Sequence, residues 1–334
     1  MKSYKENFRN GIEYATHKLN SSWFKMILLG MLGSIYVGLA YMIFIMIIAT
    51  WPGTIQDWQF DETTGRLISE FSVSISGPAL FVAAALFPVG IVLIVFLGGS
   101  LFTSDNLTML AWITKQKHSD GSDVKFKRIF IKWMYTLLGN ILGGIMIGAI
   151  CRAANFFNTD SYQYVLGYLI GKKISMEWYF VIASGFLCNI LVAGSVWASL
   201  AASHSTAKFL LIYFPIWMFA ISGFQHVVAN CILFSMGLFY MIDPSEQYNL
   251  LMGMNFACNH DLFTLITSKE ELTTLMNSSS WINVKGYAFK LSVTNMLPAA
   301  FGNWVSGSLF LPYTYYYLSE YYKNMKKNKI HNQF

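Results

Sequence analysis

Long uncharged hydrophobic runs alternate with short charged segments along this chain. The runs cover residues 26–50, 71–104, 133–151, 178–203, 209–242 and 291–319. The hydrocarbon core of a bilayer is about 30 Å thick and takes about 20 helical residues. The pattern therefore predicts six membrane-spanning helices joined by polar segments.

Two of these runs, 71–104 and 209–242, are longer than a bilayer requires, and each has glycine and serine in its middle. The first contains GGSLFTSDN (98–106) and is followed by LLGNILGG (137–144) in the next run. The second contains SGFQHVVAN (222–230) and is followed by AFGNWVSG (300–307). The second half of the chain thus repeats the first in outline. With three spans in each half, the two repeats must be inverted in the membrane.

An inverted repeat of this kind places two interrupted helices opposite each other near the middle of the bilayer. We therefore predict an all-α integral membrane protein of one transmembrane domain over residues 1–334, with six helices in a 3+3 inverted repeat. The expected spans are 26–50, 77–117 with a break near 98–104, 130–151, 178–203, 209–242 with a break near 222–226, and 294–319. This organisation is typical of a channel or transporter.

Composition and charge place the chain in the membrane and orient it. Hydrophobic residues make up 55% of the chain and charged residues 12%, with a formal net charge of +6. Lysine and arginine gather in the N-terminal segment, in the loop 115–132 and in the tail 323–329. Basic loops stay on the cytoplasmic side, so we predict a multi-pass protein of the cell membrane with both termini in the cytoplasm. The basic flanks are expected to contact lipid headgroups, and nothing in their pattern indicates a nucleic acid partner.

His226 lies within a stretch that otherwise reads as membrane-buried. An ionisable residue near the bilayer midplane indicates a functional site. Imidazole can exchange a proton near neutral pH, or donate a hydrogen bond to a passing anion. The alternative is a neutral histidine whose two ring nitrogens are both hydrogen-bonded. The sequence contains no HExxH, GxSG or CxxC motif, so we expect no metal, no cofactor and no enzyme activity.

The stretches GGSLFTSDN, LLGNILGG, GKKISMEWYF, FAISGFQHVVAN and NMLPAAFGNWVSG together resemble the formate/nitrite transporter family. The resemblance covers all six spans. It implies an aquaporin-like fold and a homopentamer with one pore in each protomer. It also implies transport of small monovalent weak-acid anions, formate or lactate above all, with a co-transported proton or as the neutral acid. Nitrite and hydrosulfide stay open as substrates, as does the choice between channel and symporter.

The resemblance also assigns roles to individual residues. Lys173 matches the lysine that attracts the anion into the vestibule, and Lys172 beside it can share that role. His226 matches the central histidine, and the Thr103 hydroxyl is placed to hydrogen-bond its ring and fix the tautomer. The implied hydrophobic constriction consists of Phe87, Ile91, Leu101, Phe102 and Phe219, and the residues implied to support the broken helices are Asn189, Gln225, Asn230 and Asn295. For Asp105 and Ser104 we expect a capping role on the short helix after the first break.

The chain departs from the family pattern at several charged positions. Members commonly have glutamate directly before the central histidine, an acid before the LFT triplet and a glutamate within span four. Here these positions hold Gln225, Ser100 and Phe180. Without a neighbouring carboxylate, His226 should be harder to protonate.

A second function stays open at this point, namely an aquaporin-like channel for water or a small neutral solute. Such channels carry Asn-Pro-Ala at both breaks. The corresponding triplets here are Ser104-Asp105-Asn106 and Val228-Ala229-Asn230, which lack proline.

Overall fold

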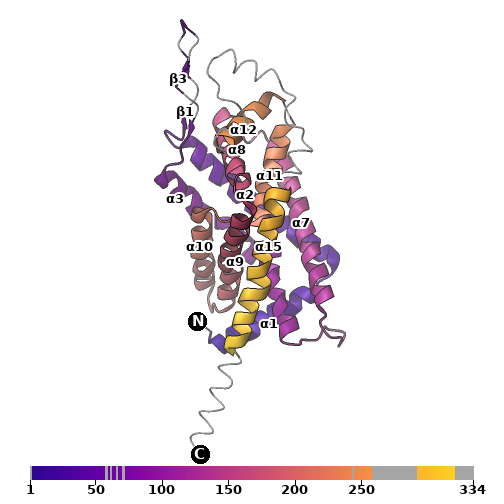
Figure 1. The fold of residues 1–334 in the computed structure, drawn as a ribbon. Coiled ribbons are helices and arrows are strands. Elements are labelled where there is room, and N and C mark those ends of the chain that lie inside the picture. The colour runs from indigo at the N-terminus through magenta and orange to yellow at the C-terminus, as the bar shows by residue number, and fades with distance from the viewer. Residues whose placement is uncertain are drawn as a thin grey trace, which may run out of the picture.

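The computed structural model describes residues 2–56, 59–60, 62–64, 67–69, 72–242, 244–257 and 292–319. The basic tail 323–329 and most of the loop 243–290 lie outside the described residues. Figure 1 shows an elongated bundle of helices that run along its long axis, with a small hairpin at the end opposite the two termini.

The elements follow one another in this order. The helices of the first half are α1 (Tyr4–Asn20), α2 (Trp23–Thr50), α3 (Gly77–Leu86), α4 (Val89–Leu97), α5 (Phe102–Asp105), the 3₁₀ turn η1 (Asn106–Thr108), α6 (Met109–Ile113) and α7 (Phe126–Ala153). The helices of the second half are α8 (Asp160–Ile174), α9 (Trp178–Leu200), α10 (Ser205–Ser222), α11 (Val227–Met241), α12 (Pro244–Ala257), the π-helix η2 (Ser292–Met296), α15 (Leu297–Trp304) and the π-helix η3 (Val305–Phe310). Helical residues 311–319 continue from η3. Strands β1 (Ile55–Gln56) and β4 (Ser72–Val73) pair antiparallel, as do β2 (Gln59–Phe60) and β3 (Leu67–Ser69).

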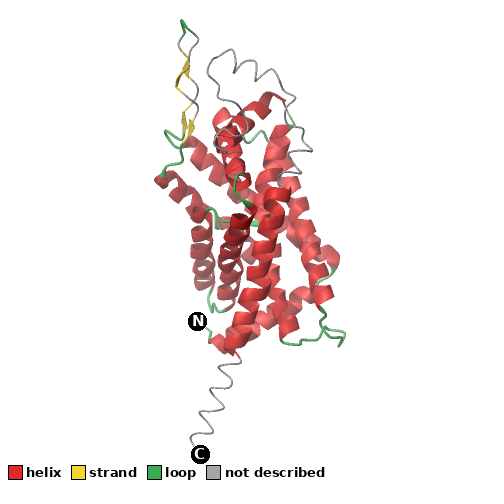
Figure 2. Cartoon of the chain, in the orientation of Figure 1, coloured by secondary structure: helices red, strands yellow, loops and turns green. Residues whose placement is uncertain are grey.

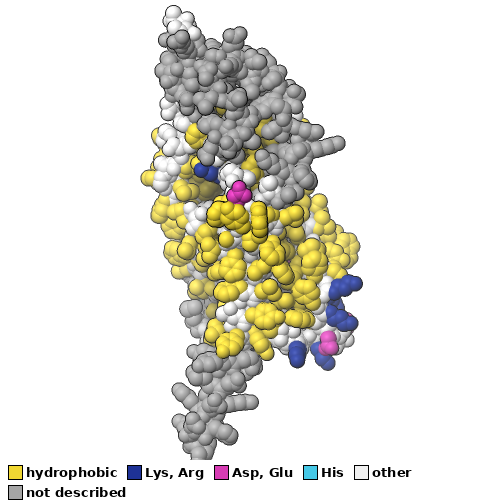
Figure 3. Space-filling model, in the orientation of Figure 1, with side chains coloured by type: hydrophobic (Ala, Val, Ile, Leu, Met, Phe, Trp, Pro, Cys, Tyr) yellow, Lys and Arg dark blue, Asp and Glu magenta, His cyan; other side chains and the backbone are white. Residues whose placement is uncertain are grey.

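Five helical segments among the described residues are long and apolar enough to cross a bilayer. They are Trp23–Thr50, Gly77–Leu97, Phe126–Ala153, Trp178–Leu200 and Ser205–Ser222, and Val227–Met241 is a shorter apolar helix. Large apolar side chains on these helices are exposed, and they form a broad hydrophobic belt around the bundle, below which Lys and Arg side chains gather at one end (Figure 3). A surface of this kind is suited to lipid, because a soluble protein rarely exposes so large an apolar area.

Non-helical segments interrupt two of the hydrophobic runs. Residues 98–101 separate α4 from α5, and residues 223–226 separate α10 from α11. Each segment begins with a glycine of positive φ, 99° at Gly98 and 63° at Gly223. Glycine ends a helix in this way because it has no Cβ to clash in the left-handed region. Figure 2 shows both segments as loops at mid-height of the bundle.

Three helices were not among the predicted elements, namely α1, α8 and α12. They lie outside the hydrophobic runs that guided the prediction. The start of α1 has its own signal in the sequence, since Ser3 and Glu6 form a capping box in which each side chain accepts a hydrogen bond from the backbone of the other. Helices α1 and α8 each end only a few residues before a spanning helix begins. Figure 1 shows α1 at the lower end of the bundle and α8 toward the upper end.

One predicted boundary needs correction. The second span was expected to continue to residue 117, but α6 ends at Ile113. The physical reason lies just beyond, because Lys115 has a φ of 53°, which a right-handed helix cannot accommodate. The chain then forms a short turn that returns through an antiparallel bridge between Lys117 and Asp123. The other predicted span ends differ from those of the helices by a few residues.

Close backbone contact joins α2 to α7. A Cβ built on Gly139 would lie 2.3 Å from the carbonyl oxygen of Ile27, and one built on Gly143 would lie 2.5 Å from that of Met31. Real Cβ atoms do not approach oxygen so closely, so the two helices can pack at this distance only with glycine at the contact. This contact fixes α7, and with it Asn140, against α2.

We predict that Gly139→Ala destabilises the folded protein in detergent. The added methyl group must push α2 and α7 apart, and overpacking of this kind costs about 1–3 kcal/mol. Gly194→Ala is the matched control, because a Cβ on Gly194 meets nothing within 4 Å and alanine favours helix. Thermal unfolding followed by circular dichroism should show a lower midpoint for Gly139→Ala than for Gly194→Ala. Equal midpoints for the two variants would contradict this account of the packing.

Candidate functional site

His226 ends the second non-helical segment and contacts α5, the short helix that follows the first. This residue is 2% exposed and is the last residue before α11. Its Nε2 lies 2.9 Å from the Oγ1 of Thr103 in α5, so the contact joins the two halves of the chain. Thr103 is also fully buried.

Hydrogen bonds determine the tautomer of His226. The backbone N–H of Ala229 donates to Nδ1 at 3.0 Å, which makes His226 the N-cap of α11. A nitrogen that accepts a hydrogen bond carries no proton, so the proton of the neutral ring is on Nε2 and is donated to the Thr103 hydroxyl. Protonation of Nδ1 would remove the cap. The geometry therefore holds the imidazole neutral, and Ala229, which the sequence did not single out, fixes the tautomer together with Thr103.

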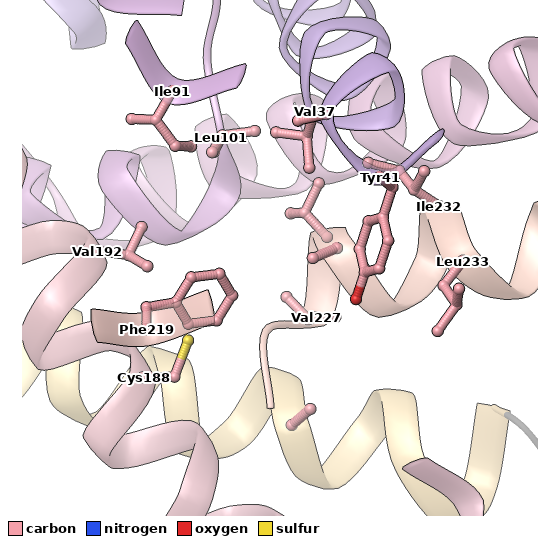
Figure 4. Close-up of a cluster of buried hydrophobic side chains, with 14 of the residues drawn as sticks. Val37, Tyr41, Ile91, Leu101, Cys188, Val192, Phe219, Val227, Ile232 and Leu233 are labelled. Atoms are coloured by element: carbon pink, nitrogen blue, oxygen red, sulfur yellow. The ribbon is translucent and has the colours of Figure 1, made fainter. Parts of the chain in front are cut away.

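Aromatic and aliphatic side chains surround this pair. The ring of Phe219 lies 5.6 Å from that of His226 and 5.9 Å from that of Phe87. Tyr41 of α2 packs edge-to-face on Phe87 at 5.1 Å. Figure 4 shows Phe219, Ile91 and Leu101 in one cluster of buried apolar side chains contributed by several helices.

The five residues expected to form a hydrophobic constriction are all buried, and all belong to the same apolar core. Phe87 and Phe219 are in ring contact, and Phe219 joins them to His226. The backbone N–H of Phe102 also donates to Asn140. A role in the constriction stays a proposal for each of them.

Asn140 satisfies the backbone of the first break. Its Oδ1 accepts the N–H of Phe102 at 2.9 Å, and its Nδ2 donates to the carbonyl oxygens of Ser100 at 2.9 Å and of Gly30 at 2.8 Å. The Asn140 side chain therefore forms hydrogen bonds with the backbone N–H and C=O groups that have no helical partner at the break, and it connects them to α2. We call this set of three bonds the first asparagine clamp.

Asn303 makes the same three bonds at the second break. Its Oδ1 accepts the N–H of Val227 at 2.9 Å, and its Nδ2 donates to the carbonyl oxygens of Gln225 at 2.9 Å and of Gly185 at 2.7 Å. This is the second asparagine clamp. Asn140 and Asn303 are the asparagines of the repeated G-N-x-x-x-G motif, so the signal for this role was in the sequence, although neither residue was assigned one.

The four residues expected to support the broken helices are also found at the breaks. Asn189 donates to the carbonyl oxygens of Thr103 and Asn303. The other three form a buried amide cluster in which Asn230 and Asn295 both donate to Gln225 Oε1, at 2.7 and 3.1 Å. Asn295 also donates to the backbone oxygen of Lys173. Asn189 and Asn295 therefore satisfy backbone groups, whereas the contacts of Asn230 are with other amides.

Lys173 lies in the last turn of α8, outside the five membrane-crossing helices. Its Nζ donates to the carbonyl oxygens of Gly223 at 2.8 Å and Phe224 at 3.0 Å, at the start of the second break. Burial lowers the pKa of Lys173 to about 8. The neighbouring Lys172 is exposed, with its ammonium over the ring of Tyr168.

At the first break the corresponding cation is Lys18, in the last turn of α1. Its Nζ lies 3.1 Å from Oδ1 of Asp105 and 2.6 Å from Oγ of Ser100. In the sequence, Lys18 is one of the basic residues of the N-terminal segment that indicate the topology. Its signal was its position, since it precedes span one as Lys173 precedes span four.

The expected capping role of Asp105 and Ser104 was wrong. Both are at the end of α5, and the Ser104 hydroxyl donates to the carbonyl oxygen of Leu101. The Asp105 side chain is fully buried and pairs with Lys18. A carboxylate removed from water needs a cation and donors rather than exposed helix N–H groups, and at this position Lys18 supplies the cation.

The site thus combines a neutral imidazole, apolar walls and a cation at each of the two breaks. Among the described residues, no group of three His, Cys, Asp or Glu side chains could hold a metal ion. Such an arrangement can donate hydrogen bonds to a small polar solute and can attract an anion at the Lys173 side, whereas the charge of Lys18 is paired with that of Asp105. Because the proton of the His226 ring is on Nε2, the imidazole is not placed to act as a general base toward the Thr103 hydroxyl.

The chain is similar in sequence to a known family and to several characterised or named proteins. The model of the formate/nitrite transporter family matches residues 5–317. A formate channel FocA of Haemophilus influenzae is 27% identical over 249 residues, which are 73% of this chain and 76% of that protein. An uncharacterized transporter YrhG of Bacillus subtilis is 28% identical and covers 68% of this chain and 76% of its own length.

Two solved structures share the fold. One is described as a pentameric formate channel with formate bound; it has a TM-score of 0.58 and 22% identity and covers 89% of this chain and 97% of its own. The other, an ion channel of the same family, has a TM-score of 0.64 and 18% identity and covers 93% and 98%. The chain therefore belongs to the formate/nitrite transporter family, whose members are membrane channels and transporters rather than enzymes.

Proposed function

We propose that this protein is a pore that carries small monovalent weak-acid anions, such as formate or lactate, with a proton or as the neutral acid. The observation that carries the proposal is the buried pair of His226 and Thr103, which is enclosed by apolar side chains and joins the second break to the short helix after the first. The names of the relatives support the substrate class, since formate channels are among them.

The path of the anion follows from the cost of burying charge. A carboxylate loses several kcal/mol of solvation when it enters a dry, low-dielectric region. Lys173 concentrates the anion at one end of the path, and the falling dielectric raises the pKa of the carboxylate until it takes a proton from water. The neutral acid then crosses the apolar section formed by Phe87, Ile91, Leu101, Phe102 and Phe219.

His226 and Thr103 bind the neutral acid at the centre of this section. Because the imidazole donates its only N–H to the Thr103 oxygen, the hydroxyl hydrogen of Thr103 is free to bind an oxygen of the substrate. The neutral ring adds no charge there. His226 in this scheme positions and polarises the hydroxyl and does not itself carry the transported proton.

The architecture of the proposed pore is six spans in an inverted 3+3 repeat, assembled as a homopentamer with one pore in each protomer. The two asparagine clamps support the repeat, because matching residues of each half make the same three bonds. The pentameric neighbour supports the assembly. The N-terminal helix and the basic loop 115–125 lie at one end of the bundle (Figure 1), and this end faces the cytoplasm.

We predict that proteoliposomes containing the protein take up labelled formate and lactate when the external pH is lower than the internal pH. His226→Phe should slow uptake by roughly twofold to tenfold, because a hydrogen bond between neutral groups contributes about 0.5–1.5 kcal/mol. His204→Phe, at an exposed position where the side chain makes no capping bond, is the matched control and should transport normally.

Uptake no faster than that of empty vesicles at every pH would refute the proposal. Osmotic shrinkage of the same vesicles distinguishes the alternative: rapid water flux without acid uptake would identify a water or neutral-solute channel.

The formate KM should depend on pH through the charge of Lys173, and this dependence can be separated from that of the substrate. Its pKa of about 8 means that the ammonium is present below pH 8 and is lost as the pH rises above it. An arginine at this position stays charged throughout. We therefore predict that the ratio of the formate KM of the wild type to that of Lys173→Arg is constant below about pH 7 and rises up to about tenfold by pH 9.

The protonation of formate itself affects both proteins equally and cancels in this ratio. Lys172→Arg, one residue away on the exposed side of the helix, is the control and should give a ratio that does not change with pH. A flat ratio for Lys173→Arg up to pH 9 would show that the charge of Lys173 does not attract the substrate.

A further inference from the structure

Lys18 and Lys173 occupy matching places at opposite ends of the bundle. Each lies in the last turn of a helix that precedes a spanning helix, α1 before α2 and α8 before α9. Each ammonium contacts one of the two breaks, Lys18 through Ser100 and Lys173 through Gly223 and Phe224. Figure 1 shows α1 at the lower end of the bundle and α8 at the upper end. We call these ends the Lys18 mouth and the Lys173 mouth.

At the Lys18 mouth the positive charge is neutralised. Asp105 Oδ1 lies 3.1 Å from the Lys18 ammonium, and the side chains are 0% and 12% exposed. Three further donors hold the carboxylate in place, namely the hydroxyls of Ser100 at 2.6 Å, Thr136 at 2.8 Å and Tyr14 at 3.3 Å. An ion pair this deeply buried is screened little by salt. An anion approaching this mouth therefore meets a group of zero net charge.

At the Lys173 mouth the ammonium faces dipoles. Its partners are two backbone carbonyl oxygens, and no carboxylate of the described residues lies within ion-pair distance of it. The clamps align the two breaks, since Asn140 binds Ser100 and Phe102 where Asn303 binds Gln225 and Val227. Counting from the clamped residues, Asn230 stands where Asp105 stands in the first half. An amide thus replaces the carboxylate, and within the described part of the chain no acidic side chain compensates the positive charge of Lys173.

We propose that this difference in charge makes the pore bind its anion more tightly from the Lys173 mouth than from the Lys18 mouth. The proposal rests on the proposed function and names Asp105 and Asn230 as the residues that set the difference. An uncompensated charge at the mouth of a low-dielectric path raises the local anion concentration by a factor of ten or more. The pore cannot change the final equilibrium, so a lower KM at one face is balanced by a lower maximal rate from that face.

The test measures the KM for labelled formate separately at each face. An affinity tag on the N-terminus lies at the Lys18 mouth (Figure 1), so capture on the tag sorts proteoliposomes by orientation. Initial uptake is then measured in both populations at equal internal and external pH. The wild type should show a KM about tenfold lower when the Lys173 mouth faces outward.

Two substitutions should move the two values in opposite directions. Asp105→Asn removes the neutralising carboxylate and should lower the KM at the Lys18 mouth severalfold. Gln225→Glu adds a carboxylate to the amide cluster, in which Asn295 also donates to the backbone oxygen of Lys173. It should raise the KM at the Lys173 mouth, with little change at the other face. Asp120→Asn, which removes an exposed carboxylate at the Lys18 end, is the control and should leave both values as in the wild type.

The outcomes separate this inference from the function on which it rests. No uptake from either face would refute the proposed function. Uptake with equal KM at both faces would leave the function standing and refute the asymmetry, and so would a Gln225→Glu variant with an unchanged KM. The Gln225→Glu arm decides the matter even where Asp105→Asn, which removes a buried hydrogen-bonded charge, yields no folded protein.

Discussion

The backbone of a membrane protein must satisfy its hydrogen bonds without help from the lipid, and the whole site depends on how this chain meets that requirement. Two helices stop at mid-height of the bundle, and each would leave bare N–H and C=O groups in an apolar setting, at a cost of several kcal/mol per group. Asn140 and Asn303 take up these groups from neighbouring helices. Without these two amides there would be no place for a polar path in the hydrophobic belt.

The distribution of charge around the site is also set by the apolar surroundings. The central ring is kept neutral by an N–H donor on one side and a hydroxyl on the other. Next to the breaks, Lys18 is paired with Asp105, and Lys173 contacts backbone carbonyl oxygens. In the part of the chain that the structure describes, Asp105 is the one buried carboxylate, and it lies beside the first break only.

The long hydrophobic runs and the repeated motifs predicted most of the fold. They indicated the hydrophobic spans and the two interruptions, because glycines in the middle of overlong uncharged runs have a direct physical meaning. They missed α1, α8 and α12, since these helices are short, carry charged residues and lie outside the long uncharged runs. His226 was distinguished in the sequence itself as an ionisable residue in a membrane-buried run, whereas the other site residues came from the resemblance: nothing in the sequence distinguishes Phe87 or Phe219 from the other phenylalanines. The ion pair of Lys18 with Asp105 joins residues 87 positions apart in two different helices, and only the packed structure brings them together.

The positions of the two asparagines in the chain also bear on the order of assembly. Asn140 follows the residue it supports, Phe102, by 38 positions, whereas Asn303 follows Val227 by 76 positions, although each asparagine belongs to the span directly after its break. Spans enter the bilayer in the order of their synthesis, so the first interruption is completed after a short stretch of further synthesis. The second has to wait for a stretch twice as long. Biogenesis should therefore pass through a five-span intermediate with an unsupported half-helix, and this is the stage at which the nascent protein depends most on the insertion machinery around it.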